Sequence, residues 1–540
     1  MPYLTSILTW LSYHPANLSF LAWISYVPII LYILKSGIRQ NGTDACQNDR
    51  IALFKNIPFV NRMGFKFHIY LSGYLFFLLG LFWLRHVTWA GLFILPGILA
   101  FYWLVFALLI RLLNRRGIIL LNILIIPALW VGLEFIRSFF LTGFPWLFAG
   151  HTQYSRLALI QISDITGVYG VSFLVMMANT AVAIAIQKKI STASVKIVSW
   201  SGVIIALLCA SAFLAMTLIY GYVRISRTDI ESGPRIGIVQ GNIEQSLKNN
   251  PPEPSIIYEK HLKLSMQLVS AEPKPDLIVW AETMFPYACS NTIEEFRIKE
   301  NMEALKEPSI MSEVPHLIGV VTFEPVENNP NFRMFNSSYY IDKNGKIIGQ
   351  YSKMHLVPIS EYVPLRKTFP WLDNIILAFS ELPEIRDMQA GINAEPFSLG
   401  AKKFGVLICY ESIFPELTRA SIRQGSDFII NISNDGWFKD SAELEQIMAI
   451  SVFRAVESKH SFIRATNTGI SAIISPCGEI NILKNSTEKY KEVDGAWSEK
   501  IPIATTRSFY VENGDYFAVL CVIISLIIIV ASALKITKNS

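Results

Sequence analysis

The sequence predicts two structural parts: a helical domain that crosses a membrane about eight times, and one water-soluble α/β domain. Three observations lead to this prediction. The 540-residue chain is 52% hydrophobic and only 16% charged, whereas a globular chain is nearer a quarter charged. Long apolar runs crowd the first 220 residues. A mixed, charged stretch of about 300 residues then alternates strand and helix patterns.

A membrane-spanning helix needs about 20 mainly apolar residues. Seven runs approach or reach that length with few or no charges inside them: 17–34, 67–84, 90–110, 118–136, 168–186, 197–220 and 517–534. The shorter apolar run 3–13 has no basic stretch before it, so we interpret it as a first span rather than as a signal peptide. So many runs favour a membrane protein over a large soluble protein with buried helices.

Basic residues set the predicted orientation. Three loops share a high content of lysine and arginine: 35–66, 111–117 and 187–196. By the positive-inside rule these loops face the cytosol. The loops 85–89 and 137–167 and the long segment after residue 220 then face outward.

This orientation gives three predicted domains. Residues 1–220 form a membrane domain with seven spans, residues 221–516 a periplasmic catalytic domain, and residues 517–540 the last span and a cytoplasmic tail. Lys535 and Lys538, just beyond that span, fit the cytosolic placement.

Charge and cysteine content exclude some partners. The net charge is only +5, from 47 basic and 42 acidic residues, which does not indicate a nucleic-acid partner. The six cysteines are scattered without a CxxC pair, so the sequence predicts no metal site and no cofactor. A disulfide between Cys289 and Cys477 stays open.

The pattern of strands and helices in the soluble segment predicts a layered α/β domain. Its predicted strands are RIGIVQGN (235–242), LIVWAET (277–283), HLIGVVTF (316–323), SSYYID (337–342), FGVLICYE (404–411), FIINISND (428–435) and SAIISP (471–476). Helical patterns lie around 254–270, 294–306, 414–424 and 441–458. Continuous apolar strands such as LIVW predict burial on both faces.

Three reactive groups stand where an apolar strand meets a turn, which is where functional sites collect. Cys409 ends GVLIC, Glu282 ends LIVWAE, and Lys353 follows KIIGQYS. Each alone has an ordinary structural interpretation, the cysteine as a small core residue and the others as solvated charges. Together they could form a nucleophilic site, because a carboxylate can take the thiol proton and a cation can stabilise the thiolate and the oxyanion.

A second carboxylate follows the lysine. Glu361 lies eight positions after Lys353, in a loop stiffened by Pro358 and Pro364. It could act as a second acid in the site or only as the partner of the lysine.

Several motifs carry a resemblance to known proteins: LTGFPWLFAG (141–150), DITGVYGVSF (164–173), VQGNIEQSLK (239–248), WAETMFP (280–286), YSKMHLVPISEYVPL (351–365), ICYESIFPE (408–416), NISNDGWFKDS (431–441), FRAVE (453–457) and RATNTGISA (464–472). The order Glu, Lys, Cys in separate strand-end motifs resembles the nitrilase, or carbon–nitrogen hydrolase, superfamily. With spans before and after that domain, nearly the whole chain resembles the bacterial apolipoprotein N-acyltransferase family.

The resemblance implies a nitrilase-like αββα sandwich and a role for each group. Glu282 is implied as the general base, Lys353 as the cation that stabilises the oxyanion, and Cys409 as the nucleophile that becomes an acyl thioester. Supporting roles are implied for three further residues: Glu361, Tyr410 and Glu411.

The implied reaction transfers an acyl chain from a phospholipid, phosphatidylethanolamine, to the α-amine of the N-terminal diacylglyceryl-cysteine of apolipoproteins. This is the last step of lipoprotein maturation. The implied location is the bacterial inner membrane, with the catalytic domain in the periplasm and membrane lipids as further partners.

Some positions depart from the family pattern. Ala281 and Thr283 stand in the motif usually written WPES, Ile359 and Ser360 replace the usual Phe-Gly, and Asn249 and Ile447 replace a Trp and a His. These departures affect the expected fit of the substrate and leave the three chemical groups intact.

Two other functions remain open from the residues alone. A membrane-tethered amidase would give the acyl group of small amides to water. A transporter or assembly factor with an inert nitrilase-like domain would need charges inside its spans, where Glu134 and Arg137 are candidates. The outward loop around Trp146 could line a lipid entrance, or Trp146 could only anchor at the membrane interface.

Overall fold

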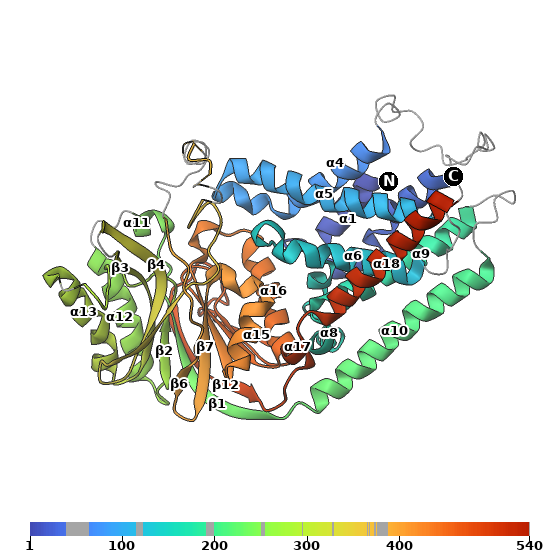
Figure 1. Cartoon of the computed structure of the whole chain (residues 1–540). Coiled ribbons are helices and arrows are strands. Elements are labelled where there is room, and N and C mark those ends of the chain that lie inside the picture. The colour runs from blue at the N-terminus through green and yellow to red at the C-terminus, as the bar shows by residue number, and fades with distance from the viewer. Residues whose placement is uncertain are drawn as a thin grey trace. The chain divides into compact units, whose positions relative to one another are not determined.

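The computed structural model describes residues 1–38, 64–114, 122–190, 199–249, 254–293, 295–326, 329–363, 366, 368–371, 374 and 387–538. The chain divides into two compact units, which contain the elements labelled in Figure 1. The helical unit comprises Met1–Arg85, Ala90–Val223 and Asp515–Ser540, and the α/β unit comprises His86–Trp89 and Arg224–Gly514. Pro364, Cys46 and the loop residues 39–63, 115–121 and 191–198 lie outside the described residues.

Among its described residues, the helical unit contains four helices that are long and apolar enough to cross a membrane. They are α5 (Trp89–Asn114), α6 (Asn122–Phe139), α9 (Val168–Ile190) and α10 (Trp200–Ser226). Shorter apolar helices in the described parts cover Ser19–Lys35, Phe65–Gly80, Leu157–Thr166 and Tyr516–Ser532. The helical membrane domain is therefore confirmed, and the total of about eight spans stays a prediction.

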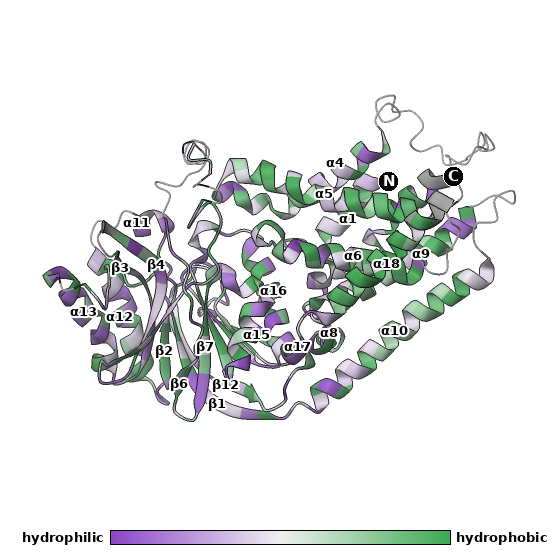
Figure 2. Cartoon of the chain, viewed as in Figure 1, coloured by the Kyte–Doolittle hydropathy of each residue, from purple (hydrophilic) through white to green (hydrophobic). Residues whose placement is uncertain are grey.

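The other helices of this unit are α1 (Pro2–Leu11), α2 (Ala22–Ser25), α3 (Val27–Ile38), α4 (Phe65–Gly80), α7 (Leu157–Ile160), α8 (Ser163–Thr166) and α18 (Tyr516–Lys538). Apolar residues cover most of the helical ribbon (Figure 2). On α10, the side chains of Ile204, Leu208 and Ile219 are 54%, 64% and 64% exposed. Apolar side chains turned outward on a long helix suit a lipid environment, where the helix satisfies its own backbone hydrogen bonds.

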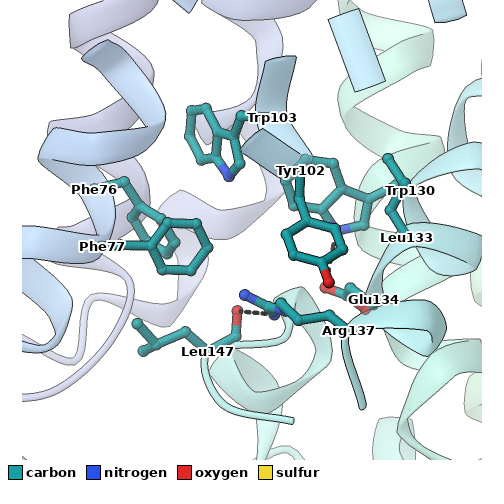
Figure 3. A pocket seen from close by; sticks show the side chains of 9 residues that line it. All are labelled: Phe76, Phe77, Tyr102, Trp103, Trp130, Leu133, Glu134, Arg137 and Leu147. Atoms are coloured by element: carbon teal, nitrogen blue, oxygen red, sulfur yellow. Dashed lines mark hydrogen bonds between the residues drawn. The ribbon is translucent and has the colours of Figure 1, made fainter. Parts of the chain in front are cut away.

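Glu134 and Arg137 lie one turn apart near the end of α6 and border a small pocket (Figure 3). Glu134 Oε1 accepts hydrogen bonds from Trp130 Nε1 at 2.8 Å and from the backbone N–H of Ala149 at 2.7 Å. Arg137 donates to the carbonyl oxygen of Leu147 at 3.4 Å. Both charged residues thus hold the loop backbone against α6, which gives them a structural role.

Aromatic rings from three helices form most of the pocket wall: Phe76, Phe77, Tyr102, Trp103 and Trp130. Trp146, in the loop that follows α6, is only 2% exposed and packs against Trp83 with ring centroids 5.4 Å apart. A simple interfacial anchor would be exposed to the headgroup region, so this burial argues against that interpretation. The lipid entrance stays a prediction.

The α/β unit contains two six-stranded sheets, with strand orders β12-β1-β2-β3-β4-β5 and β11-β10-β9-β8-β7-β6. The first sheet comprises β1 (Ile230–Gln240), β2 (Leu277–Trp280), β3 (His316–Val326), β4 (Asn329–Ile341), β5 (Ile347–Ser352) and β12 (Gly495–Ala504). The second comprises β6 (Phe397–Leu399), β7 (Lys402–Ile408), β8 (Phe428–Ser433), β9 (Ser461–Thr466), β10 (Ala472–Ile474) and β11 (Ile480–Ile482).

Alternate side chains of β2 belong to two different cores. Leu277 and Val279 lie in a core that also contains side chains of the second sheet, such as Val406 and Ile430. Ile278 and Trp280 lie in the other core, with side chains of α12 (Pro254–Ser270) and α13 (Phe296–Ser312). The two sheets therefore pack face to face.

Helices cover the outer faces of both sheets (Figure 1). On the second sheet they are α15 (Pro415–Arg423) and α16 (Glu443–Ser458). The observed layering is helix, sheet, sheet, helix, which confirms the predicted nitrilase-like αββα sandwich.

Two predictions made for this unit need correction or completion. Cys289 and Cys477 are both free thiols, so the disulfide left open by the sequence does not form. Strands β6, β9, β11 and β12 were missed. β6 and β11 have only three residues each, Arg464 interrupts the apolar run of β9, and Glu499 and Lys500 stand side by side in β12. Such segments are too short or too interrupted to show the alternation or the apolar run that predicts a strand.

Candidate active site

Cys409 lies where the central strand β7 ends and a short 3-10 helix, Cys409–Ile413, begins. Its backbone φ is +52°, in the left-handed region that a residue with a Cβ rarely adopts. Such a conformation costs about 1–3 kcal/mol and persists only where surrounding contacts fix it. The Cys409 carbonyl oxygen accepts from Ser412 Oγ at 3.0 Å and from Asn431 Nδ2 at 3.3 Å. The turn therefore holds the half-buried thiol at the carboxyl end of the strand.

Glu282 lies just after β2, and both of its carboxylate oxygens have hydrogen-bond donors. Oε1 accepts from Asn336 Nδ2 at 2.6 Å, and Oε2 accepts from the backbone N–H of Asn434 at 2.8 Å. The residue is 7% exposed. Because both oxygens are fixed, the carboxylate is oriented before any substrate arrives.

Lys353 follows β5 and is 1% exposed. Its Nζ lies 2.9 Å from Glu361 Oε1 and 3.8 Å from Glu282 Oε1. Burial by itself would lower the pKa of Lys353, but the negative charges of Glu361 and Glu282 outweigh it and raise that pKa. Lys353 therefore carries a fixed positive charge inside the site.

The charges of this cluster act on the Cys409 thiol. Burial, and then the negative charge of Glu282, raises the pKa of the thiol, while Lys353 opposes that rise. At neutral pH the resting side chain is therefore a protonated thiol. A nucleophilic sulfur then requires a base to take the proton, and Glu282 is the carboxylate whose charge acts on it most strongly.

Glu361 belongs to the cluster as the partner of the lysine. Its Oε1 accepts from Lys353 Nζ and, at 3.1 Å, from Asn336 Nδ2. Its Oε2 accepts from the backbone N–H of Val357 at 2.7 Å, which holds its own loop. Of the two roles left open by the sequence, the geometry favours the lysine's partner.

Glu411 is fully buried and links two strand ends. Oε1 accepts from the backbone N–H groups of Met354 and His355, at 2.7 and 3.0 Å. Oε2 accepts from the N–H of Ile408 at 2.7 Å and from Tyr351 Oη at 2.8 Å. Glu411 thus joins the segment after Lys353 to the turn at Cys409.

Tyr410 is half-buried and lies against aromatic neighbours. Its ring centroid is 5.1 Å from that of Phe414 and 6.0 Å from that of His355. The geometry gives Tyr410 a packing role beside Cys409.

Sequence reasoning missed Asn336 and Asn434. Asn336 lies on β4 and donates from one amide nitrogen to both Glu282 and Glu361. The signal was present, since a buried Asn inside a strand needs hydrogen-bond partners. The segment around Asn434 carried part of the resemblance, but nothing in its spacing assigned it a role.

The departures from the family pattern leave the cluster intact. Ala281 is fully buried and Ile447 is 3% exposed. Thr283 has a φ of +53°, and its hydroxyl accepts a hydrogen bond from Lys248, which also donates to the Glu282 carbonyl oxygen at 3.3 Å. The side chain of Asn249 lies outside the described residues.

Two family models match the chain. The model for carbon-nitrogen hydrolases matches residues 235–494, and the model for the apolipoprotein N-acyltransferase N-terminal domain matches residues 51–181. The two models fall on the α/β part and the helical part of the chain.

Curated relatives match most of the chain. An apolipoprotein N-acyltransferase of Geobacter metallireducens is 36% identical over 432 residues, which is 79% of this chain and 77% of the relative. One of Rhizobium rhizogenes is 33% identical over 436 residues, with 76% of each chain covered.

A solved carbon-nitrogen hydrolase from Helicobacter pylori G27 matches with 17% identity and a TM-score of 0.36, covering 50% of this chain and 89% of that one. That similarity is too low to support an argument, so the assignment depends on the relatives and the family models. At 36% identity over more than three quarters of both chains, this protein belongs to the apolipoprotein N-acyltransferase family.

Proposed function

We propose that this enzyme transfers an acyl chain from a phospholipid, phosphatidylethanolamine, to the α-amine of the N-terminal diacylglyceryl-cysteine of apolipoproteins. Glu282, Lys353 and Cys409 are proposed as its catalytic residues. The observation that carries the proposal is their convergence: the Lys353 ammonium lies 3.8 Å from Glu282, and both charges act on the Cys409 thiol. A base, a cation and a nucleophile in one buried cluster suit acyl transfer.

In the first step, Glu282 takes the thiol proton while Cys409 Sγ attacks the ester carbonyl carbon. The Lys353 ammonium stabilises the negative oxygen of the tetrahedral intermediate. The ester C–O bond then breaks, and protonated Glu282 returns the proton to the leaving alkoxide of the lysophospholipid. Cys409 remains as a thioester.

In the second step, the free α-amine attacks the thioester carbonyl and gives a proton to Glu282. The C–S bond breaks as the amide forms, and the sulfur takes the proton back from Glu282. Because both substrates are anchored in a membrane, a site held at the membrane face would limit their search to two dimensions and favour their alignment.

The proposed location is the bacterial inner membrane, with residues 221–516 in the periplasm. The basic residues of the loops between the predicted spans support this orientation, among them Lys188 and Lys189 at the end of α9. The membrane-tethered amidase is less supported, because the relatives named as N-acyltransferases match about three quarters of the chain. An amidase of small amides would need no such long helical part.

Intact mass spectrometry of the purified full chain tests the proposal. After incubation with phosphatidylethanolamine, the native chain should gain one acyl mass that hydroxylamine removes, and Cys409→Ala should gain none. Cys477→Ala is a matched control, because Cys477 is another cysteine of the same unit, 4% exposed, with no part in the cluster. An adduct on Cys409→Ala, or none on the native chain while the lipid is bound, would contradict the thioester.

A further inference from the structure

A closed ring of buried polar side chains begins and ends at Cys409. Strands β7 and β8 pair in parallel with Ile408 beside Ile432. Ser433, the last residue of β8, therefore lies next to Cys409, and its hydroxyl acts on the thiol. The Ser433 hydroxyl donates to Asp435 Oδ1 at 2.5 Å. Asp435 Oδ2 accepts from Arg464 at 2.9 Å, and Arg464 donates to Asn431 Oδ1 at 3.0 Å. Asn431 Nδ2 then donates to the Cys409 carbonyl oxygen at 3.3 Å.

The ring is buried. Ser433, Asp435, Asn431 and Arg464 are each no more than 1% exposed. Strands β8 and β9 pair in parallel with Asn431 beside Arg464, so the sheet itself sets part of the ring. A polar chain without access to water keeps its geometry, because each broken hydrogen bond would leave an unsatisfied group.

A glycine makes room for Asp435. A Cβ at Gly469 would lie 2.1 Å from Asp435 Oδ2, closer than any real contact. The aspartate can therefore reach Arg464 only because residue 469 has no side chain. Asp435 and Arg464 form an ion pair in which both side chains are 1% exposed, which fixes the oxygen that Ser433 faces.

The Ser433 hydroxyl has one proton and two neighbouring acceptors. While Cys409 is a thiol, the proton is held by the charged oxygen of Asp435. When the sulfur becomes a thiolate, the hydroxyl can rotate and donate to it. The charged groups that act on the sulfur are Glu282, Lys353 and Asp435.

We propose that Ser433 is a hydrogen-bond donor to the Cys409 sulfur in both half-reactions, and that Asp435 and Arg464 are positioning residues that hold its hydroxyl in place. The donor acts when the thiol loses its proton in the first step. It acts again when the sulfur leaves the thioester in the second. This role rests on the proposed function of Cys409 as the nucleophile.

The test measures the reactivity of Cys409 separately from acyl transfer. Iodoacetamide labelling of the full chain is followed by peptide mass spectrometry across a pH series, and the labelling rate gives the apparent pKa of the Cys409 thiol. The labelling experiment needs no lipid. If the proposed function is wrong, only the thioester assay fails. If the proposed role of Ser433 is wrong, the labelling experiment shows no change in the thiol pKa.

Ser433→Ala should raise the apparent thiol pKa by about one unit and slow thioester formation about ten-fold, the size of one hydrogen bond to a charged group. Ser458→Ala is the matched control, because Ser458 is 2% exposed and donates only to carbonyl oxygens of its own helix. It should leave both readouts unchanged. A Ser433→Ala chain with the native pKa and the native thioester rate would overturn the proposal.

Asp435→Asn gives a second test with the opposite sign. It removes a negative charge near the sulfur and frees the Ser433 proton, so the apparent thiol pKa should fall. Because the loss of this charge lowers the thiol pKa by itself, the deciding readout stays at Ser433, where a purely structural role would lower stability without raising the thiol pKa. If Ser433→Ala does not fold, Ser433→Thr, which keeps the hydroxyl, is compared with Ser433→Val, which has the same shape without it, and an equal thiol pKa in the two variants would contradict the proposal.

Discussion

Asn336 Nδ2 lies 2.6 Å from Glu282 Oε1, so a side chain of β4 orients the carboxylate that follows β2. The same nitrogen donates to Glu361 at 3.1 Å, and Lys353 contacts both carboxylates. One amide thus holds two acids around one ammonium.

Replacing Asn336 should impair the chemistry more than the binding of lipid. Asn336→Asp would place a third carboxylate between Glu282 and Glu361, and repulsion should turn Glu282 away from the sulfur. We expect thioester formation to slow by about 100-fold, with KM for the lipid changed less than three-fold. Single-turnover mass spectrometry measures this rate. Asn485→Asp, at an exposed turn, should have no effect, and a native rate for Asn336→Asp would refute the orienting role.

Removing the Lys353 ammonium should slow thioester formation by about 100- to 1,000-fold, because the oxyanion loses its cation. Lys353→Met keeps the length of the side chain without the charge. The single-turnover rate checks this expectation. Lys484→Met is a suitable control, since Lys484 is 45% exposed and pairs with Glu488 on the surface. A loss of less than ten-fold would show that the charge does not stabilise the transition state.

Glu411→Gln should destabilise the unit and also slow the reaction. An amide nitrogen would face a backbone N–H where a carboxylate oxygen now accepts, so at least one buried donor would lose its acceptor. The expected cost is about 1–3 kcal/mol of unfolding free energy. Thermal unfolding of the full chain, followed by circular dichroism, measures it as a lower Tm. Because Glu411 holds the turn at Cys409, the thioester rate should fall as well, and an unchanged Tm would contradict this role.

Stability should fall as the pH drops below about 6.5. His261 and His316 are fully buried on either side of Trp280, and burial lowers the pKa of each imidazole to about 4. The unfolded chain therefore binds these protons more readily than the folded one. Their contribution to stability is complete above the unfolded pKa and is lost as the pH falls toward 4. At pH 5.5 the loss is on the order of 1 kcal/mol for each histidine.

The check is the Tm of the full chain between pH 7.5 and 5.5. His316→Asn should reduce this pH dependence by up to half, because an amide nitrogen can replace the Nδ1 donor to the Val314 carbonyl oxygen without titrating. His151→Asn is a control in the helical unit. A pH dependence that His316→Asn leaves unchanged would place its origin elsewhere.

Much of this protein is readable from the sequence by itself, because periodicity reports burial. The four helices of the described residues that could cross a membrane follow apolar runs that only lipid or a large core could accept. Strands such as LIVW, whose continuous apolar residues require cover on both faces, predict a layered α/β domain, and the family resemblance implies its αββα order. Glu282, Lys353 and Cys409 were found because each stands where a strand meets a turn, which is where functional sites collect.

Tertiary structure alone decided how those groups are held. Asn336 lies 54 positions after Glu282, and Asn434 lies 152 positions after it, yet both donate to that carboxylate. No local pattern reports such pairs, since hydrogen bonds between distant segments depend on strand order and register rather than on spacing. Strand β9 was not predicted for the same reason. Arg464 breaks its apolar run, and this charge can lie inside the fold only because it is paired with the distant residue Asp435. Sequence reports which side chains must be buried, and only the packed sheets determine which of them meet.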